Sequence, residues 1–158
     1  MTTVTYANGI MASDGQITIG NHIILSEFKK VFNINKLLLG FTGSTDNIAP
    51  IKHYIENCKA KEIDTHTFYM EISKLLAEQS EVLVFKNNLV SVTSEGYCTL
   101  GDKDTIYSTG SGAVFARTAL ELGYNAIKAV EVASNFDIYT NHNIYAVSLD
   151  GSDQELEI

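Results

Sequence analysis

Long apolar runs are missing from this sequence: no segment approaches the roughly 18 consecutive apolar residues that a membrane-spanning helix requires. A charged and then apolar leader is also missing from the N-terminus. Both absences predict a cytoplasmic protein with no membrane partner. The chain has 158 residues, of which 45% are hydrophobic. Because single domains usually span about 100 to 150 residues, we expect one domain over residues 1–158.

Positive charge and metal-binding patterns are scarce as well. Lysine and arginine number 11 against 19 acidic residues, for a net charge of −8; they form no cluster, so no nucleic-acid partner is expected. Cys58 and Cys98 lie far apart and match neither a metal nor a redox spacing, so we expect reduced, buried thiols. The four histidines are scattered. The glycine-rich segment 109–112 lacks the Gly-Lys-Ser/Thr of a P-loop, so no metal, nucleotide or other cofactor is predicted.

The N-terminus offers a reactive group. An initiator methionine followed by a small residue is normally removed, which would make Thr2 of Met1-Thr2-Thr3 the first residue. An N-terminal threonine combines a nucleophilic Oγ with an α-amine of pKa about 7.7 to 8.0 that can take the hydroxyl proton. The same three residues are also a common start for an edge strand, so residues further along the chain must decide between the two interpretations.

A tight hairpin is predicted directly after this N-terminus. Asn8-Gly9 stands between two β-prone segments, and both residues tolerate the positive φ of a two-residue hairpin loop. Counting outward from this loop places Asp14 opposite Thr3, one residue from Thr2. A loop one residue longer would reverse the faces. The side to which Asp14 points therefore stays open, whereas its proximity to Thr2 does not.

A lysine pair and a segment of small residues follow. Lys29 and Lys30 are surrounded by apolar residues. Because neighbouring side chains of a strand point to opposite faces, at most one of the two enters the interior; a surface pair is the alternative. The segment 40–46 (GFTGSTD) comes after an apolar strand. Its small residues would allow backbone or substrate to approach closely.

The order of elements predicts the fold. Alternating or continuous apolar runs predict strands over 3–6, 11–13, 17–19, 22–25, 28–32, 37–39, 82–85, 89–92, 97–100, 105–108 and 144–149. Helical spacing predicts four helices, from about Asn47, after Asp64-Thr65, over 113–122, and from Asn125 to about Asn135. Helix pairs between runs of antiparallel strands are typical of two sheets enclosed by helical layers. The expected fold is α+β, a four-layer αββα sandwich.

Each predicted helix has an apolar side. These sides are Ile48, Ile51, Ile55 and Cys58 in the first helix; Phe68, Ile72, Leu75 and Leu76 in the second; Val114, Phe115, Thr118 and Leu122 in the third; and Ile127, Val130 and Ser134 in the fourth.

Together these segments resemble the proteasome β-type subunits and HslV-like peptidases, which are N-terminal-nucleophile (Ntn) hydrolases. Each motif is weak alone, but their shared order and spacing over nearly the whole chain are specific. The opening hairpin is shorter than in HslV-like peptidases by the same number of residues in each arm, which keeps its register. The matching motifs are Thr2-Thr3, Asn8-Gly9, Asp14-Gly15-Gln16, Gly20-Asn21, Lys29-Lys30-Val31, Gly40-Phe41-Thr42-Gly43, Ser108-Thr109-Gly110-Ser111-Gly112 and Ile138-Tyr139-Thr140-Asn141-His142.

The resemblance implies a role for each matching residue. Thr2 corresponds to the nucleophile, Asp14 to the acidic residue behind it, and Lys30 to the lysine that lowers the proton affinity of the threonine. Gly43 corresponds to the glycine whose N–H forms the oxyanion hole. The remaining matches are Ser111 beside the N-terminal amine, Asp137 and Thr140, which complete the network, and Phe28 and Phe41, which are expected to line the pocket for the residue before the cut.

The resemblance also implies a function. It indicates a threonine endopeptidase that forms a homo-oligomeric ring or double ring, acts on unfolded polypeptide, and has an ATP-dependent unfoldase as a partner. One alternative is a catalytically silent, proteasome-like ring with a scaffolding role; another is an Ntn amidohydrolase acting on a small amide. The complete set of matching residues favours catalysis over a scaffold. The lack of long pocket-building insertions disfavours the amidohydrolase.

Overall fold

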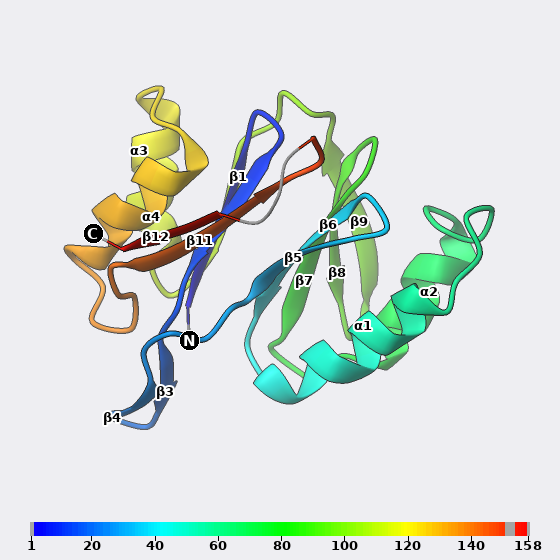
Figure 1. The fold of residues 1–158 in the computed structure, drawn as a ribbon, viewed down its shortest axis with the longest axis horizontal. Coiled ribbons are helices and arrows are strands. Elements are labelled where there is room, and N and C mark those ends of the chain that lie inside the picture. Colours follow the sequence, from blue (N-terminus) through cyan, green and yellow to red (C-terminus); the bar gives the residue numbers. More distant parts are fainter. Residues whose placement is uncertain (1, 151–153, 158) are drawn as a thin grey trace.

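The computed structural model describes residues 2–150 and 154–157, which form four stacked layers, helices outside and two sheets between them (Figure 1). The predicted αββα arrangement is confirmed. The first sheet is antiparallel with the order β10-β1-β2-β11-β12. Its strands are β1 (Thr3–Ala7), β2 (Ile10–Asp14), β10 (Tyr107–Gly110), β11 (Asn143–Ser148) and β12 (Gln154–Glu157).

The second sheet is antiparallel with the order β5-β6-β7-β8-β9. Its strands are β5 (Val31–Ile34), β6 (Leu37–Thr42), β7 (Glu81–Phe85), β8 (Leu89–Thr93) and β9 (Gly96–Gly101). The predicted strand over 28–32 begins only at Val31. Residues 28–30 instead form an irregular segment that leads into β5, and Phe28 N donates to Gly15 O, just after β2, at 2.8 Å. This segment carries Lys30 toward the end of β2.

The two sheets pack face to face through large side chains. Tyr6 of β1 and Phe85 of β7 lie with ring centroids 4.9 Å apart, and Leu38 and Leu83 of the second sheet are fully buried in the same cluster. Burying one such side chain stabilises the fold by about 1.5–3 kcal/mol. The contact between sheets therefore fixes how β1 and β5 lie relative to each other.

The helices cover the outer faces of the sheets (Figure 1). The helices α1 (Ile48–Glu56) and α2 (His66–Lys74) pack on the second sheet, and α3 (Ala113–Glu121) and α4 (Ala126–Ser134) on the first. A short 3₁₀ helix, η1 (Thr45–Asn47), precedes α1. Among the described residues, no helix is long and apolar enough to cross a membrane.

The buried faces of the first two helices are largely as predicted, with Ile51, Ile55, Phe68 and Ile72 in the core. Leu75 is the exception: it follows the end of α2 and is exposed.

The third helix forms as predicted, but its predicted buried face was wrong. Val114 and Leu122 are 75% and 74% exposed, and Ala116, Ala119 and Leu120 are buried instead. The small alanines let α3 approach the sheet and α4 closely, so the face with the larger side chains remains outside. In α4, Val130 is buried as predicted, but Ile127 and Ser134 are only partly buried and alanines fill the interface. Both cysteines are free, as predicted, but their predicted burial was wrong, because Cys98 is exposed and Cys58 only partly buried.

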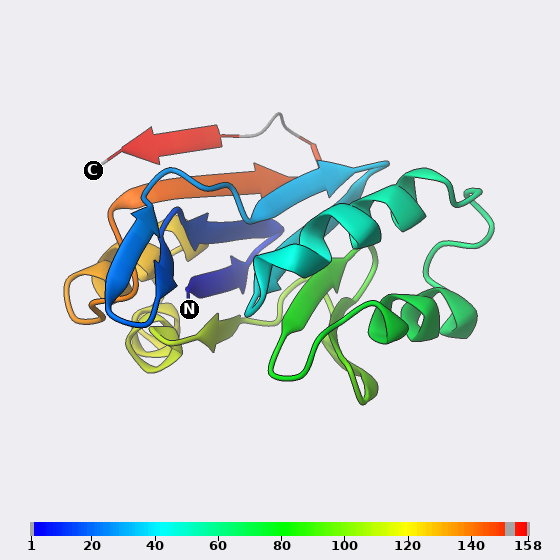
Figure 2. The ribbon, with the colours of Figure 1, turned by 90° about the horizontal axis from the view of Figure 1, so that it is seen from below.

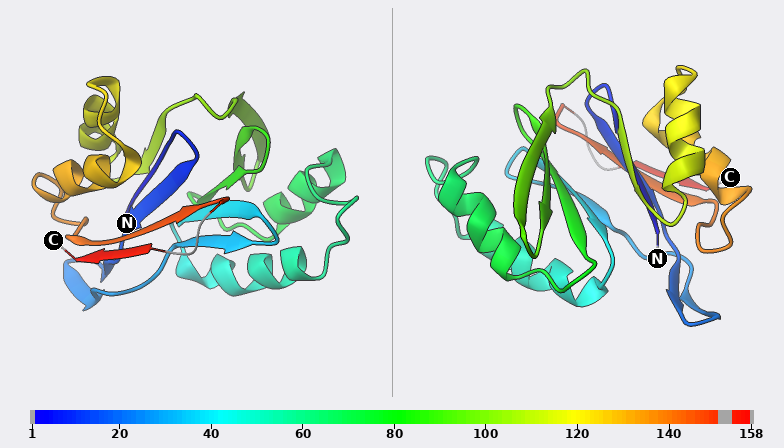
Figure 3. Two further views of the ribbon diagram at one scale, coloured as in Figure 1. Left: turned by 45° about the horizontal axis from the view of Figure 1, so that its top comes forward. Right: turned by 180° about the vertical axis from the view of Figure 1, so that it is seen from behind.

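A separate hairpin of β3 (Ile17–Ile19) and β4 (His22–Leu25) projects from the layers beside the N-terminus (Figure 3). It carries four exposed apolar side chains, Ile19, Ile23, Ile24 and Leu25. An exposed apolar patch of this kind is typical of a protein–protein contact.

Candidate active site

The predicted hairpin brings Asp14 to Thr2. The register pairs Thr5 with Ala12 and Val4 with Ser13, so Asp14 comes opposite Thr3 as the Asn8-Gly9 loop predicts. Asp14 points to the side of Thr2, whose Oγ1 donates a hydrogen bond to Asp14 Oδ1. The structure thus shows to which side of the hairpin the Asp14 side chain points, which the sequence left open.

Asp14 is fully buried, yet its carboxylate accepts several hydrogen bonds. Besides the hydroxyl of Thr2, Oδ1 accepts Thr3 N at 3.1 Å and Lys30 Nζ at 3.3 Å. Oδ2 accepts Gln16 N at 3.1 Å and Asn141 N at 3.2 Å. A buried charge is tolerated only when it is paired and hydrogen-bonded in this way.

Lys30 is buried between Thr2 and Asp14. Its Nζ lies 2.6 Å from Thr2 Oγ1 and also donates to the carbonyl oxygen of Gln16. Burial lowers the pKa of the Lys30 ammonium, and the charge of Asp14 opposes that shift. Lys29 does not reach Thr2: it is partly buried, with its Nζ 5.4 Å from the ring centroid of Phe32. Only one of the two lysines thus enters the site, as expected, although residues 28–30 are not part of a strand.

A second group of polar side chains lies next to Thr2. Ser111 N donates to Thr2 O at 2.8 Å, and Ser111 Oγ donates to Asp137 Oδ2 at 2.6 Å. Thr140 Oγ1 donates to the same oxygen at 2.6 Å and lies 2.7 Å from Thr3 Oγ1. This network joins the start of β1, the start of α3 and the segment before β11. Figure 2 shows the course of these three segments.

Two glycines allow the backbone to come close at this site. At Gly110, where φ is +100°, an added Cβ would lie 1.7 Å from Thr2 O. At Gly43, where φ is +90°, it would lie 2.6 Å from Ser80 Oγ. Only glycine adopts both the positive φ and the close contact without strain. The glycines of segment 109–112 therefore serve packing against the N-terminal strand.

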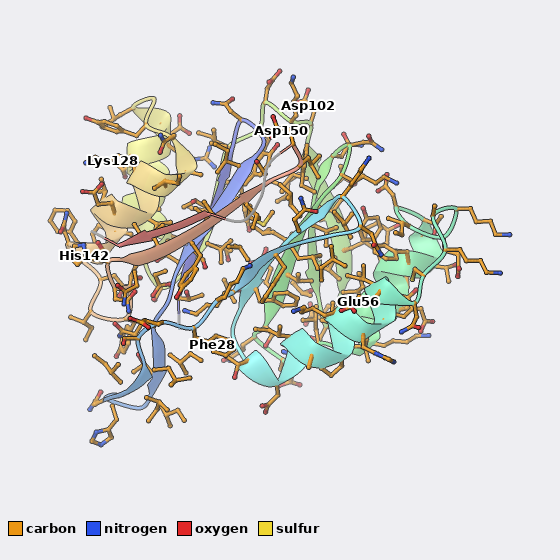
Figure 4. The ribbon with its side chains drawn as sticks, viewed as in Figure 1. Phe28, Glu56, Asp102, Lys128, His142 and Asp150 are labelled. Atoms are coloured by element: carbon orange, nitrogen blue, oxygen red, sulfur yellow. The ribbon has the colours of Figure 1, made fainter. Side chains whose placement is uncertain are left out.

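Two cavities meet at Thr2. The smaller, of about 300 Å³, is lined by Lys30, Phe41, Gly43 and the hairpin residues Ile17 and Ile19, among others. Phe41 thus lies where the sequence predicts a pocket. Phe28 is not among the lining residues of this cavity and packs, partly buried, against the core cluster beneath α1 and α2 (Figure 4). The reason is that residues 28–30 do not form the expected strand.

Sequence reasoning missed several groups of this site. Thr3 N, Gln16 N and Asn141 N hold Asp14, and Gln16 O accepts from Lys30. All four are backbone groups, so no residue type signals them. The only signal for these contacts in the sequence was that Gln16 and Asn141 belong to the matching motifs Asp14-Gly15-Gln16 and Thr140-Asn141. Within the described part of the chain, no group of three or more His, Cys, Asp or Glu side chains could hold a metal ion.

Comparison with known proteins gives the family. No family model matches the chain. The chain is 30% identical over 162 residues to the ATP-dependent protease subunit HslV of Sulfurimonas denitrificans, a match that covers 90% of each protein. The chain belongs to the HslV family. The HslV subunit of Borrelia turicatae is 31% identical over 159 residues, with 85% of this chain and 87% of that protein covered.

A solved structure agrees on the fold of this HslV-family chain. The eukaryotic HslV of Trypanosoma brucei matches with a TM-score of 0.68 and 21% identity over 93% of this chain and 98% of that one. The expected Ntn-hydrolase fold and the class of threonine-type peptidase subunit are confirmed.

Proposed function

We propose that Thr2 is the nucleophile once Met1, which lies outside the described residues, has been removed. Thr2 Oγ would attack the peptide carbonyl carbon while the α-amine takes the hydroxyl proton. The C–N bond would break as that proton passes to the leaving amine, and water would hydrolyse the resulting ester. The observation that carries this proposal is the 2.6 Å contact between Lys30 Nζ and Thr2 Oγ1.

Lys30 and Asp14 have complementary roles in this proposal. A cationic Lys30 stabilises the negative charge that develops on Oγ as the proton leaves. Asp14 keeps the ammonium charged and in place, since burial alone lowers the pKa of Lys30. Both charges can be buried here only because each is paired with the opposite charge of the other.

Gly43 is the proposed oxyanion donor. It lines both cavities that meet at Thr2, and its positive φ turns the local backbone away from an ordinary strand. A backbone N–H at this position would bind the oxygen of the tetrahedral intermediate. Loss of one such donor elsewhere costs about 2.7–4 kcal/mol.

Ser111, Asp137 and Thr140 are proposed to hold the backbone of Thr2 and the proton path at its amine. Ser111 N fixes Thr2 O, and the two hydroxyls that share Asp137 Oδ2 connect this contact to Thr3. The substrate residue before the cut would enter the smaller cavity, with Phe41 in its wall.

Assembly into a homo-oligomeric ring or double ring is also part of the proposal, with unfolded polypeptide as substrate. The exposed apolar side chains of the β3–β4 hairpin and of α3 support it, because a monomer rarely leaves such patches uncovered. An ATP-dependent unfoldase is proposed as partner, in line with the name of the relatives, ATP-dependent protease subunit HslV. The cytoplasmic location and the single domain over residues 1–158 stay predictions.

Peptide hydrolysis by two variants tests the function. Thr2→Ala removes the hydroxyl and should abolish turnover without loss of the fold, because the residue lies at a chain end. Thr2→Ser keeps both hydroxyl and amine and should retain part of the activity. Equal turnover by wild type and Thr2→Ala would exclude Thr2 as nucleophile. A correctly assembled wild-type ring with no turnover would favour the scaffolding alternative.

A further inference from the structure

A second cavity, of about 1270 Å³, opens on the other side of Thr2. It runs between the segment that leads into β7 and the segment that joins β10 to α3, and Gly43 and Ser111 both line it. A cavity that is continuous with the nucleophile is in position to hold part of the substrate.

The lining of this larger cavity carries charge of one sign. Its described residues include Glu78, Glu81 and Glu95 and no lysine, arginine or histidine. They also include no Val, Leu, Ile, Met or aromatic residue. The three carboxylates would attract a cationic substrate side chain.

Glu81 is the glutamate of this cavity that the protein holds in a fixed position. Its Oε1 accepts Thr109 Oγ1 at 2.5 Å, and its Oε2 accepts Tyr107 OH at 3.1 Å and the hydroxyl of Ser91. Burial, and then the charge of Glu81, raises the pKa of Tyr107 to about 12, so the phenol stays a neutral donor. All three partners are neutral hydroxyls, so they orient the carboxylate without cancelling its charge, and a carboxylate can accept about four hydrogen bonds.

The two cavities share Thr2 and Gly43, the proposed nucleophile and oxyanion donor. The peptide bond that is cut must therefore lie where the cavities meet. The substrate residue before the cut is proposed to enter the smaller cavity, which Phe41 lines. The polypeptide after the cut then extends into the larger cavity, whose lining includes Gly110 and Ser111, two residues that do not line the smaller one.

We propose that Glu81 is a specificity-determining residue that selects lysine or arginine in the first few positions after the cut. The inference rests on the proposed peptidase function. It assigns to this chain a preference on the leaving side of the substrate, separate from the pocket that Phe41 lines.

The test uses the assembled protein and two quenched peptides that are identical up to the cut and carry lysine or glutamate at the positions after it. A peptidyl aminocoumarin amide, which has no residue after the cut, serves as the third substrate. Wild type is expected to show about a tenfold higher kcat/KM for the lysine peptide, and this preference should fall as salt is added, because the cavity is open to solvent.

Glu81→Gln should remove most of the lysine preference. Glu71→Gln makes the same charge change at an exposed site on α2, where Glu71 pairs with Lys74, and should leave the preference at its wild-type value. A preference that survives in Glu81→Gln would overturn the assignment to Glu81.

The wild-type comparison needs no variant and keeps the inference testable if Glu81→Gln fails to fold. Wild type that cleaves the coumarin amide but treats both peptides equally would overturn the inference and leave the peptidase proposal standing. Wild type that cleaves none of the three substrates would instead contradict the proposed function on which the inference rests.

Discussion

At the scale of single residues, the site depends on two opposite charges that are buried beside one hydroxyl. Lys30 is 3% exposed and Asp14 is 0% exposed. Burial of either charge alone would be costly, but together they are compatible with the fold, and both contact Thr2 Oγ1. Stability and activity are therefore expected to change together when one partner is removed.

Lys30→Ala should lower the rate of peptide hydrolysis by about 10²–10³-fold and the free energy of unfolding by about 3–5 kcal/mol, because Asp14 is left unpaired. Urea denaturation and steady-state kinetics measure the two effects. Lys29→Ala is the matched control, since the neighbouring lysine lies outside the site. An equal loss of activity in both variants would argue against a special role for Lys30.

The lowered pKa of Lys30 predicts the alkaline side of the pH profile. Activity should rise with pH as the α-amine loses its proton, at about pH 7.7–8.0. As the pH increases further, activity should fall as Lys30 becomes neutral, and the midpoint of this fall should lie below pH 10.5, the usual pKa of lysine. The same shift affects stability: the contribution of Lys30 is fully present above 10.5 and is lost as the pH falls through the lower folded-state pKa. A kcat/KM profile that declines only above pH 10.5 would contradict this.

The sequence predicts which residues come together at the site, but it does not predict the backbone hydrogen bonds that hold them there. The Asn8-Gly9 loop is enough to bring Asp14 to Thr2, since a two-residue turn fixes the register. The facing of Asp14 depends on one residue of loop length, and the contacts from Gln16 and Asn141 are made by backbone atoms. Neither leaves a pattern in residue types. Phe28 was wrongly predicted to line the pocket, because a hydrogen bond from its backbone N to Gly15 O takes the place of the expected strand.

At the scale of elements, turns and caps account for much of the predicted order. Asn125 accepts Lys128 N at 2.8 Å at the start of α4, and Thr65 accepts Phe68 N at 3.2 Å at the start of α2. Both positions were predicted from residue type. The buried face of α3 was not predicted, because alanines form the close contact while its larger side chains stay exposed. Periodicity locates an apolar helix face but does not show whether that face is buried in the core or exposed on the surface.

Asn125→Ala should lower the free energy of unfolding by about 1 kcal/mol, because the amide of Lys128 loses its side-chain acceptor. Chemical denaturation followed by circular dichroism measures this loss. Asn135→Ala, at the exposed end of the same helix, should change stability by less than about 0.5 kcal/mol. Equal losses in both variants would show that the cap has no special contribution.

At the scale of the whole molecule, contacts between copies of the chain would explain why the β3–β4 hairpin exposes apolar side chains. The β3–β4 hairpin lies beside Thr2 and walls the smaller cavity through Ile17 and Ile19. A neighbouring copy that contacts this hairpin would therefore also influence the site.

The double variant Ile23→Asp and Ile24→Asp should dissociate the proposed ring, because it places charge where an apolar contact is expected. Light scattering at micromolar concentration measures the mass, and Asn88→Asp, at an exposed turn between β7 and β8, is the control that should stay assembled. Wild type that is monomeric at this concentration would contradict the ring.

The most direct test of the central claim, that Thr2 is an N-terminal nucleophile, is the intact mass of natively expressed protein before and after reaction with a peptide epoxyketone. This reagent needs both a hydroxyl and a free amine on one residue, since the hydroxyl adds to the ketone and the amine opens the epoxide. We expect loss of Met1 and then one adduct per chain, located at Thr2 and missing in Thr2→Ala. Retained Met1 with no adduct, or an adduct at another residue, would contradict it.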